Sequence, residues 1–196
     1  MNTANSESSQ KKILTIPNLL SLFRLCLIPV MIWLYCVKRD SLGTTLVLLL
    51  SGATDVADGL IARRFHMVSD FGKAFDPVAD KLTQISMLVC LITRFPYMLI
   101  PLLCLTVKEV ASASLHLLVI RKTGVVPAAV WHGKVTTVLL YATMLLHLVW
   151  GQIPAPLSYS LIAVCTAMIL LSGVLYTLRS CQALRGASRT KETPAP

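Results

Sequence analysis

The sequence has few charged residues. Lys, Arg, Asp and Glu make up 14% of its 196 residues, and only nine residues are acidic. In soluble domains roughly a quarter of all residues are charged, so this composition argues against an ordinary soluble protein. Hydrophobic residues reach 55%, and the mean hydropathy is +0.71. We therefore predict an integral membrane protein of one domain, with room for roughly six helical spans.

Other absences narrow the class further. The six cysteines show no CxxC or metal-ligand spacing, which argues against a disulfide framework or a zinc site. No Ser-His-Asp arrangement and no internal repeat is apparent. The first sixteen residues lack the basic, apolar and small-residue pattern of a secretory signal. We therefore expect the N-terminus to stay in the cytosol and the first apolar run to be an anchor.

Apolar runs separated by turn-forming residues predict six helices. Their expected ranges are 17–37, 42–64, 74–94, 98–120, 131–150 and 157–178. The predicted fold class is thus all-α integral membrane, with six transmembrane helices. Residues 1–16 would form a cytosolic segment, 17–180 a six-helix membrane catalytic domain, and 181–196 a mobile cytosolic tail.

The net charge of +9 raises the question of which anionic partner the chain meets. The basic residues lie beside apolar runs rather than on a soluble face, so we expect anionic membrane lipids and no nucleic acid. Most Lys and Arg residues fall on the same side of the predicted spans as the N-terminus, and Lys38, Arg39 and Arg94 fall on the other. By the positive-inside rule, both termini face the cytosol.

Five of the nine acidic residues lie within residues 55–80, in the run DVADGLIARRFHMVSDFGKAFDPVAD, and four of them form two closely spaced pairs, Asp55 with Asp58 and Asp76 with Asp80. The apolar stretch before Asp55 would make about 20 Å of helix, which is too short for a hydrocarbon core of roughly 30 Å. The second helix must therefore continue through Asp55 and Asp58, and the third begins near Asp76. Asp55 and Asp58 then share one helix face, and Asp76 and Asp80 share another.

These four carboxylates predict a metal site at the cytosolic boundary of the membrane. Without cations, they would repel one another and some would protonate. Two divalent ions would balance the four negative charges, and all-oxygen ligands suit Mg²⁺ or Mn²⁺. A pair of such ions is a common device for displacement at phosphorus. The site therefore indicates phosphoryl or phosphatidyl chemistry.

Neighbouring residues favour a phosphate-bearing ligand. Gly59 and Ala62 lie on the same predicted helix as the first two aspartates, and small residues let a bulky ligand approach the backbone. Gly72 fits the same interpretation. Arg63 offers a planar fork of donors to a phosphate, whereas Arg64 fits a simple topology anchor.

The spacing DxxDGxxARx8GxxxDxxxD resembles, at every specified position, the signature of the CDP-alcohol phosphatidyltransferase family. The segments IPNLLSLFRLCLIP, FDPVADK and GKVTT also resemble the family branches that make phosphatidylglycerophosphate and cardiolipin. This resemblance covers most of the chain and implies a six-helix membrane fold that is usually dimeric. It also implies that a phosphatidyl group passes from CDP-diacylglycerol to an alcohol, with divalent metal bound and CMP released.

The resemblance also implies residue roles. Asp55, Asp58 and Asp76 would hold metal. Asp80, also near the metal ions, would be the catalytic base that takes the proton of the attacking hydroxyl. The residues implied in binding the CDP-lipid are Asn18, Arg24, Gly59, Ala62, Arg63, Ser69 and Gly72.

The acceptor alcohol is open. Glycerol 3-phosphate is the favoured acceptor, and its phosphate would need basic groups on later helices. The candidates are Lys108, His116, Arg121 and Lys134. The phosphatidylglycerophosphate branch usually has Arg-Glu and a later Arg in the fourth helix, where this chain has Lys108-Glu109 and His116, so phosphatidylglycerol or an inositol-type acceptor stays open.

Alternative interpretations remain beside these. An internal salt bridge explains Lys108-Glu109 about as well as acceptor binding does. His66, His132 and His147 show no metal-ligand spacing and fit boundary or packing positions better. A small ion-coupled transporter is the alternative of another class. It would place its charges near the membrane midplane in repeated halves, and this pattern does not occur here.

Overall fold

Nearly all of the described backbone is helical. The computed structural model describes residues 16–64, 70–123 and 131–192, and within these ranges no strand occurs. Side chains are not described for the helical residues 16–18, 58, 59, 61–63, 70–75, 122, 123 and 183–192. The predicted all-α fold is confirmed.

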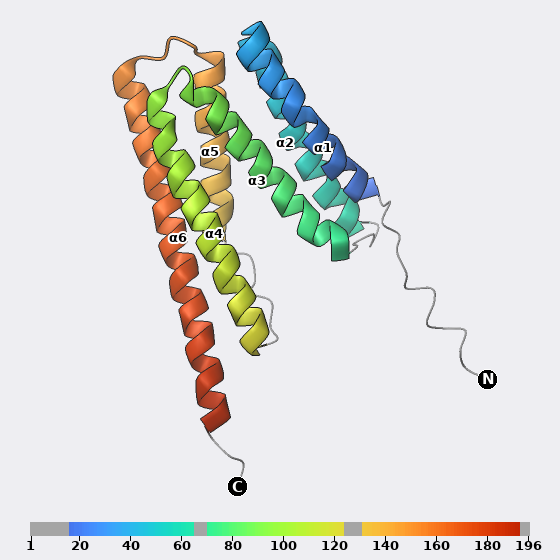
Figure 1. Cartoon of the computed structure of the whole chain (residues 1–196), viewed down its shortest axis with the longest axis vertical. Coiled ribbons are helices and arrows are strands. Elements are labelled where there is room, and N and C mark those ends of the chain that lie inside the picture. The colour runs from blue at the N-terminus through green and yellow to red at the C-terminus, as the bar shows by residue number, and fades with distance from the viewer. Residues whose placement is uncertain (1–15, 65–69, 124–130, 193–196) are drawn as a thin grey trace, which may run out of the picture. The chain divides into compact units, whose positions relative to one another are not determined.

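The chain divides into two compact units, residues 1–87 and residues 88–196, each of which is described by itself. In the first unit, α1 (Ile16–Ile32) continues into the π-helix η1 (Trp33–Lys38) and is followed by α2 (Ser41–Arg64). These helices pack side by side along much of their length (Figure 1). The next helix, α3 (Asp70–Ile92), begins in this unit and ends in the second.

A tight turn joins η1 to α2. Arg39 has left-handed backbone angles, φ 54° and ψ 29°. Asp40 then caps α2, because its carboxylate accepts a hydrogen bond from the Gly43 N–H at 2.9 Å. A side chain at Gly43 would come within 2.5 Å of the Asp40 carboxylate. Glycine at this position therefore makes room for the cap.

The second unit contains the short 3₁₀ helix η2 (Pro96–Met98), α4 (Leu99–Thr123), α5 (Trp131–Val149) and α6 (Ala155–Glu192). Both α4 and α5 pack against α6, which is therefore the central helix of this unit (Figure 1).

A buried histidine joins α5 to the start of α6. The Nδ1–H of His147 donates to the Thr143 carbonyl oxygen at 2.8 Å, and its Nε2 accepts from the Ser158 hydroxyl at 2.9 Å. Because a carbonyl can only accept, these contacts fix which ring nitrogen carries the proton. The Phe95 ring lies edge-on to the imidazole, with the ring centroids 4.8 Å apart. His147 is therefore a packing residue, as its sequence context predicts.

The observed helices match the six predicted ranges closely, with two differences. The third helix begins at Asp70 rather than at 74, and the sixth continues past 178 to Glu192. Most of the predicted tail, 181–196, is therefore helical in its backbone, and the mobility of that segment stays a prediction.

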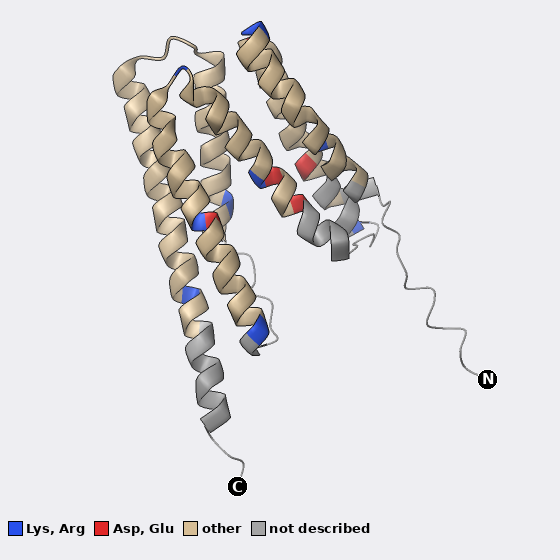
Figure 2. Ribbon diagram, viewed as in Figure 1, with Lys and Arg blue, Asp and Glu red and all other residues tan. Residues whose placement is uncertain are grey.

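Charged residues are sparse along the described helices (Figure 2). By length and hydropathy, the segments Leu19–Lys38, Pro96–Arg121 and Ala155–Gln182 can each cross a membrane, and Ser41–Ala57 is a shorter apolar helix. Large apolar side chains also face outward, for example Val107, which is 68% exposed. Such surfaces suit contact with lipid. The protein is therefore an integral membrane protein, and the count of six spans stays a prediction.

Replacing the cap of α2 should lower stability. Asp40→Ala removes the acceptor for the Gly43 N–H and should cost about 1 kcal/mol, seen as a lower thermal unfolding midpoint in detergent micelles. Asp40→Asn keeps a side-chain oxygen and should melt close to the unmodified protein. An equal decrease of the unfolding midpoint in both variants would show that Asp40 does not stabilise the protein by capping α2.

Candidate active site

The site begins with two buried polar side chains on α1. Ser21 and Arg24 are three residues apart and therefore share one face of the helix. Both are fully buried, at 0% exposed. Asn18 lies three residues earlier in the same direction, but its side chain is outside the described part. The mostly apolar helix α1 therefore has a buried polar face that contains Ser21 and Arg24.

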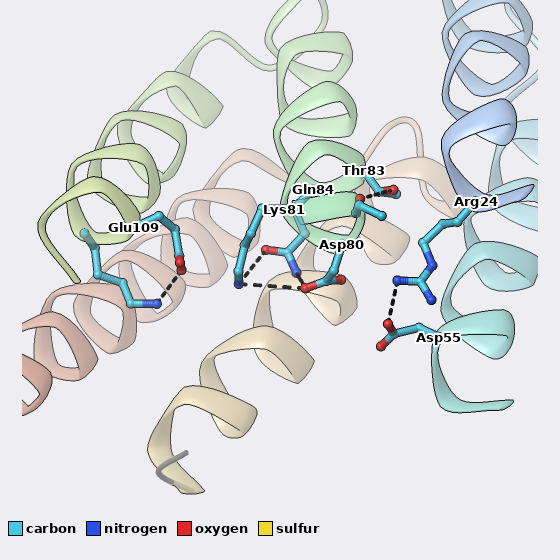
Figure 3. Close-up of polar contacts among 9 residues, drawn as sticks. Arg24, Asp55, Asp80, Lys81, Thr83, Gln84 and Glu109 are labelled. Carbon is cyan, nitrogen blue, oxygen red and sulfur yellow. Dashed lines mark hydrogen bonds and ion pairs between the residues drawn. The ribbon is translucent and has the colours of Figure 1, made fainter. Parts of the chain in front are cut away.

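Arg24 forms an ion pair with α2. Its Nη1 lies 2.6 Å from Oδ1 of Asp55, whose side chain is 43% exposed (Figure 3). A buried guanidinium is costly without a counter-charge. Asp55 supplies that charge, so the position of this carboxylate depends on α1.

Ser21 makes the corresponding contact with α3. Its hydroxyl donates a hydrogen bond to Oδ1 of Asp76, which is half-buried. One face of α1 therefore contacts an aspartate from each of the two following helices.

Asp80 is oriented from within α3. Its Oδ2 accepts a hydrogen bond from Nε2 of Gln84 at 2.8 Å, and Gln84 is fully buried. Lys81 lies beside this pair, with its Nζ 3.4 Å from Oε1 of Gln84 and 3.8 Å from Oδ2 of Asp80 (Figure 3). The carboxylate is thus held by an amide one turn away and lies near a positive charge.

Three of the four predicted aspartates therefore lie in one region of the first unit. The negative charges of Asp80 and Asp76 lie near enough to Asp55 to act on its carboxylate. Asp58 is one turn further along α2, but its side chain is outside the described part. Among the side chains that are described, no three acidic, histidine or cysteine residues are arranged to hold a metal ion.

Four of the seven predicted CDP-lipid residues fall on the helices that carry the aspartates. Gly59, Ala62 and Arg63 belong to α2 and Gly72 belongs to α3. The surroundings of these four residues, and the whole of Ser69, lie outside the description. Arg24 is the predicted binding residue whose contacts are defined, and its described partner is Asp55.

The predicted acceptor residues lie in the second unit. Lys108 forms an ion pair with the adjacent Glu109 at 2.6 Å (Figure 3). His116 lies edge-on to the ring of Tyr176 on α6. Arg121, near the end of α4, and Lys134, near the start of α5, are exposed.

Sequence reasoning missed Ser21, Lys81 and Gln84. A signal for the first was present, because Ser21 stands midway in a run of polar residues spaced by three along an apolar helix, from position 18 to position 24. Gln84 follows Asp80 by four residues, the spacing of side chains that meet on a helix.

These features define a class of protein: an all-helical integral membrane protein whose polar site joins aspartates from two helices to a serine and an arginine of a third. Residues 14–178 match the CDP-alcohol phosphatidyltransferase family. The chain belongs to this family, as the aspartate spacing predicts, and is therefore an enzyme, a phosphatidyltransferase of phospholipid biosynthesis.

Three of the curated relatives illustrate two named activities. A cardiolipin synthase (CMP-forming) of Streptomyces coelicolor is 35% identical over 184 residues, which cover 86% of this chain and 83% of the relative. A probable phosphatidylglycerophosphate synthase of Mycobacterium tuberculosis is 31% identical over 193 residues, covering 93% and 90%. A CDP-diacylglycerol–glycerol-3-phosphate 3-phosphatidyltransferase of Rickettsia typhi is 37% identical over 97 residues, covering 48% and 54%.

The pairing of α1 with α2 can be measured by a double-mutant cycle on Arg24→Met and Asp55→Asn. We expect a coupling energy of about 1.5–3 kcal/mol, the range for hydrogen bonds to charged groups, from unfolding of the four proteins in detergent. Asp55→Asn alone should destabilise more than the double variant, because it leaves the buried guanidinium of Arg24 without its counter-charge. Additive losses would mean that the two side chains do not stabilise each other.

Proposed function

We propose that this enzyme moves a phosphatidyl group from CDP-diacylglycerol to a hydroxyl of glycerol 3-phosphate and releases CMP. The observation that carries the proposal is that Asp76 and Asp80 lie within electrostatic range of Asp55, which is paired with Arg24 of α1. These aspartates occupy the signature positions of the family. One named relative is a CDP-diacylglycerol–glycerol-3-phosphate 3-phosphatidyltransferase and another is a probable phosphatidylglycerophosphate synthase, which supports glycerol 3-phosphate as the acceptor.

The donor set fits divalent metal ions. Carboxylates from α2 and α3 lie near one another, and carboxylate oxygens are the ligands that Mg²⁺ and Mn²⁺ prefer. The charges of Asp76 and Asp80 oppose that of Asp55, and cations would relieve this repulsion. In the proposal, Asp55, Asp58, Asp76 and Asp80 hold two ions. Bound there, the ions would neutralise the pyrophosphate of the donor.

The described side chains suggest how transfer proceeds. Asp80 takes the proton of the acceptor hydroxyl, whose oxygen forms a new bond to the phosphorus that carries diacylglycerol. The bond from this phosphorus to the CMP oxygen breaks, and CMP leaves with the electron pair. Gln84 supports this role for Asp80, because its hydrogen bond to Oδ2 fixes the orientation of the carboxylate. Ser21 orients Asp76 in the same way.

The proposed arrangement in the membrane follows from the distribution of charge. Six helices span the bilayer, both termini lie in the cytosol, and the aspartates lie at the cytosolic boundary. The enzyme acts as a homodimer, as the family resemblance implies.

Phosphatidylglycerol is the second candidate acceptor, which would make the product cardiolipin. The supporting observation is the long match to the cardiolipin synthase of Streptomyces coelicolor, which covers 86% of this chain. The residues that replace two arginines of the other branch, Lys108 and His116, lack a bidentate fork for a phosphate.

A panel of acceptors tests the proposal. Purified protein in lipid nanodiscs receives CDP-diacylglycerol and Mg²⁺ or Mn²⁺ with glycerol 3-phosphate, phosphatidylglycerol, inositol phosphate or serine. We expect CMP release with glycerol 3-phosphate, phosphatidylglycerophosphate as the lipid detected by mass spectrometry, and loss of turnover after chelation that metal restores. No CMP release with any acceptor would sink the proposal. Metal-dependent ion flux in liposomes would then favour a transporter.

Replacing the proposed base separates chemistry from binding. Asp80→Asn should lower kcat by about 10²–10⁴-fold, the usual contribution of a general base, while CDP-diacylglycerol still binds. Asp40→Asn is the matched control, because it makes the same change outside the site and should leave kcat unchanged. Unmodified turnover in Asp80→Asn would remove this residue as the base.

A further inference from the structure

A second group of polar side chains surrounds one aromatic ring in the second unit. Tyr176 on α6 lies edge-on to His116 of α4, with ring centroids 5.9 Å apart, and to His132 of α5, at 5.3 Å. Nζ of Lys108 lies 5.7 Å from the centre of the same ring. Tyr176 thus brings side chains of α4 and α5 to one place, although each helix packs against α6 rather than mainly against the other.

The position of Tyr176 depends on a glycine in the first turn of α5. A Cβ at Gly133 would lie 2.7 Å from the Tyr176 hydroxyl oxygen and 3.4 Å from two of its ring carbons. No residue with a side chain fits at position 133 without moving the tyrosine. The close contact therefore fixes the ring against the beginning of α5.

The group carries an excess of positive charge. Arg179 and Lys108 both place positive charge near His132. Glu109 is the only acidic residue between positions 88 and 191 of the sequence, and it is paired with Lys108. Positive charge that no acidic residue neutralises is costly inside a membrane protein. The charge of Arg179 therefore favours an anionic partner.

The contrast between two histidines of α5 points to a ligand. His132 and His147 are both buried, at 5% and 1% exposed. Both ring nitrogens of His147 have protein partners. Nδ1 of His132 is buried and has no hydrogen-bond partner in the described part of the chain. An unsatisfied buried nitrogen costs about 1–3 kcal/mol, so a native structure that retains one calls for a partner outside the protein.

The start of α5 suits an anion for a second reason. The first N–H groups of a helix lack partners within the helix, and the helix dipole is positive at this end. The helix begins at Trp131 and has no acidic residue in its first turn. His132 and Lys134 both lie in that turn, so backbone and side-chain donors occur together, as in phosphate sites at helix N-termini.

We propose that His132, held against Tyr176 at the start of α5, is a further ligand for the phosphate of a phosphate ester, beside the acceptor candidate His116. This inference rests on the proposed function, since the ester would be the acceptor alcohol. Three residues of this phosphate subsite are not among the acceptor candidates predicted from sequence. In the proposal, His132 binds the phosphate, Tyr176 positions His132, and Gly133 leaves room for the Tyr176 ring. The predicted packing role of His132 is revised accordingly.

The test compares binding of two substrates to the full-length enzyme in nanodiscs. For His132→Gln, we expect the Kd of glycerol 3-phosphate, measured by calorimetry without CDP-diacylglycerol, to rise about ten- to hundredfold, the effect of losing a hydrogen bond to a charged group. The KM for CDP-diacylglycerol should stay unchanged. An unchanged Kd, or an equal loss for both substrates, would overturn the subsite.

Positioning by Tyr176 has its own variants. Tyr176→Leu and Gly133→Ala should raise the KM for the acceptor more than they lower kcat, whereas Tyr176→Phe keeps the ring and should behave like the unmodified enzyme. Tyr159→Leu removes a tyrosine of the same helix that packs against Tyr97, with ring centroids 4.9 Å apart. An equal rise of KM in Tyr159→Leu would show a general packing effect and overturn the positioning role.

Two sources of the phosphate are separated by the acceptor arms. If soluble glycerol 3-phosphate does not bind but the KM for phosphatidylglycerol rises in His132→Gln, the subsite holds a lipid headgroup. If no acceptor supports turnover, the proposed function fails. Calorimetry then still tests the subsite. Binding of glycerol 3-phosphate that is weakened by His132→Gln supports the subsite, and no binding of glycerol 3-phosphate overturns it. His147→Gln is the matched control for a buried histidine, since it should lower the melting temperature without changing phosphate affinity.

Discussion

The buried guanidinium of Arg24 is the constraint on which the first unit depends. A full positive charge with no exposed surface requires a negative partner at contact distance, and Asp55 is that partner. Ser21, on the same face of α1, holds Asp76 of α3. The first helix therefore determines where carboxylates from two other helices stand. A site that looks in the sequence like two acidic pairs is, in the folded chain, built around α1.

The sequence predicts the parts of this site that depend on local geometry. Apolar runs separated by turn residues predict the helices, and spacings of three and four residues place the aspartates on shared faces. Ser21 and Gln84 escape such reasoning, because serine and glutamine also occur in membrane helices without any acidic partner, and only the tertiary contact distinguishes them. The sequence pattern predicts too short a sixth helix for a different reason. The apolar run stops near 178, but the residues that follow are mostly good helix formers and lack proline.

The second unit shows the same limit in its histidines. His132 and His147 occupy similar apolar surroundings in the sequence, and both fit packing positions. Their environments differ because Ser158, from another helix, satisfies one imidazole, whereas the other meets a tyrosine ring and nearby cations. Glycine at position 133 permits the close approach of Tyr176, whose ring contacts His132. Polar residues on α4 and α5 come close together only through their contacts with α6, and the sequence does not show such contacts.

The length of α6 has a mechanical consequence. Its 38 residues make a helix of about 57 Å at 1.5 Å per residue, whereas the hydrocarbon layer is roughly 30 Å thick. Observed tilts, up to about 40°, shorten its vertical span too little to remove this excess. Some turns of α6 must therefore emerge into the headgroup layer. The depth of Tyr176 in the membrane therefore depends on the thickness of the surrounding bilayer.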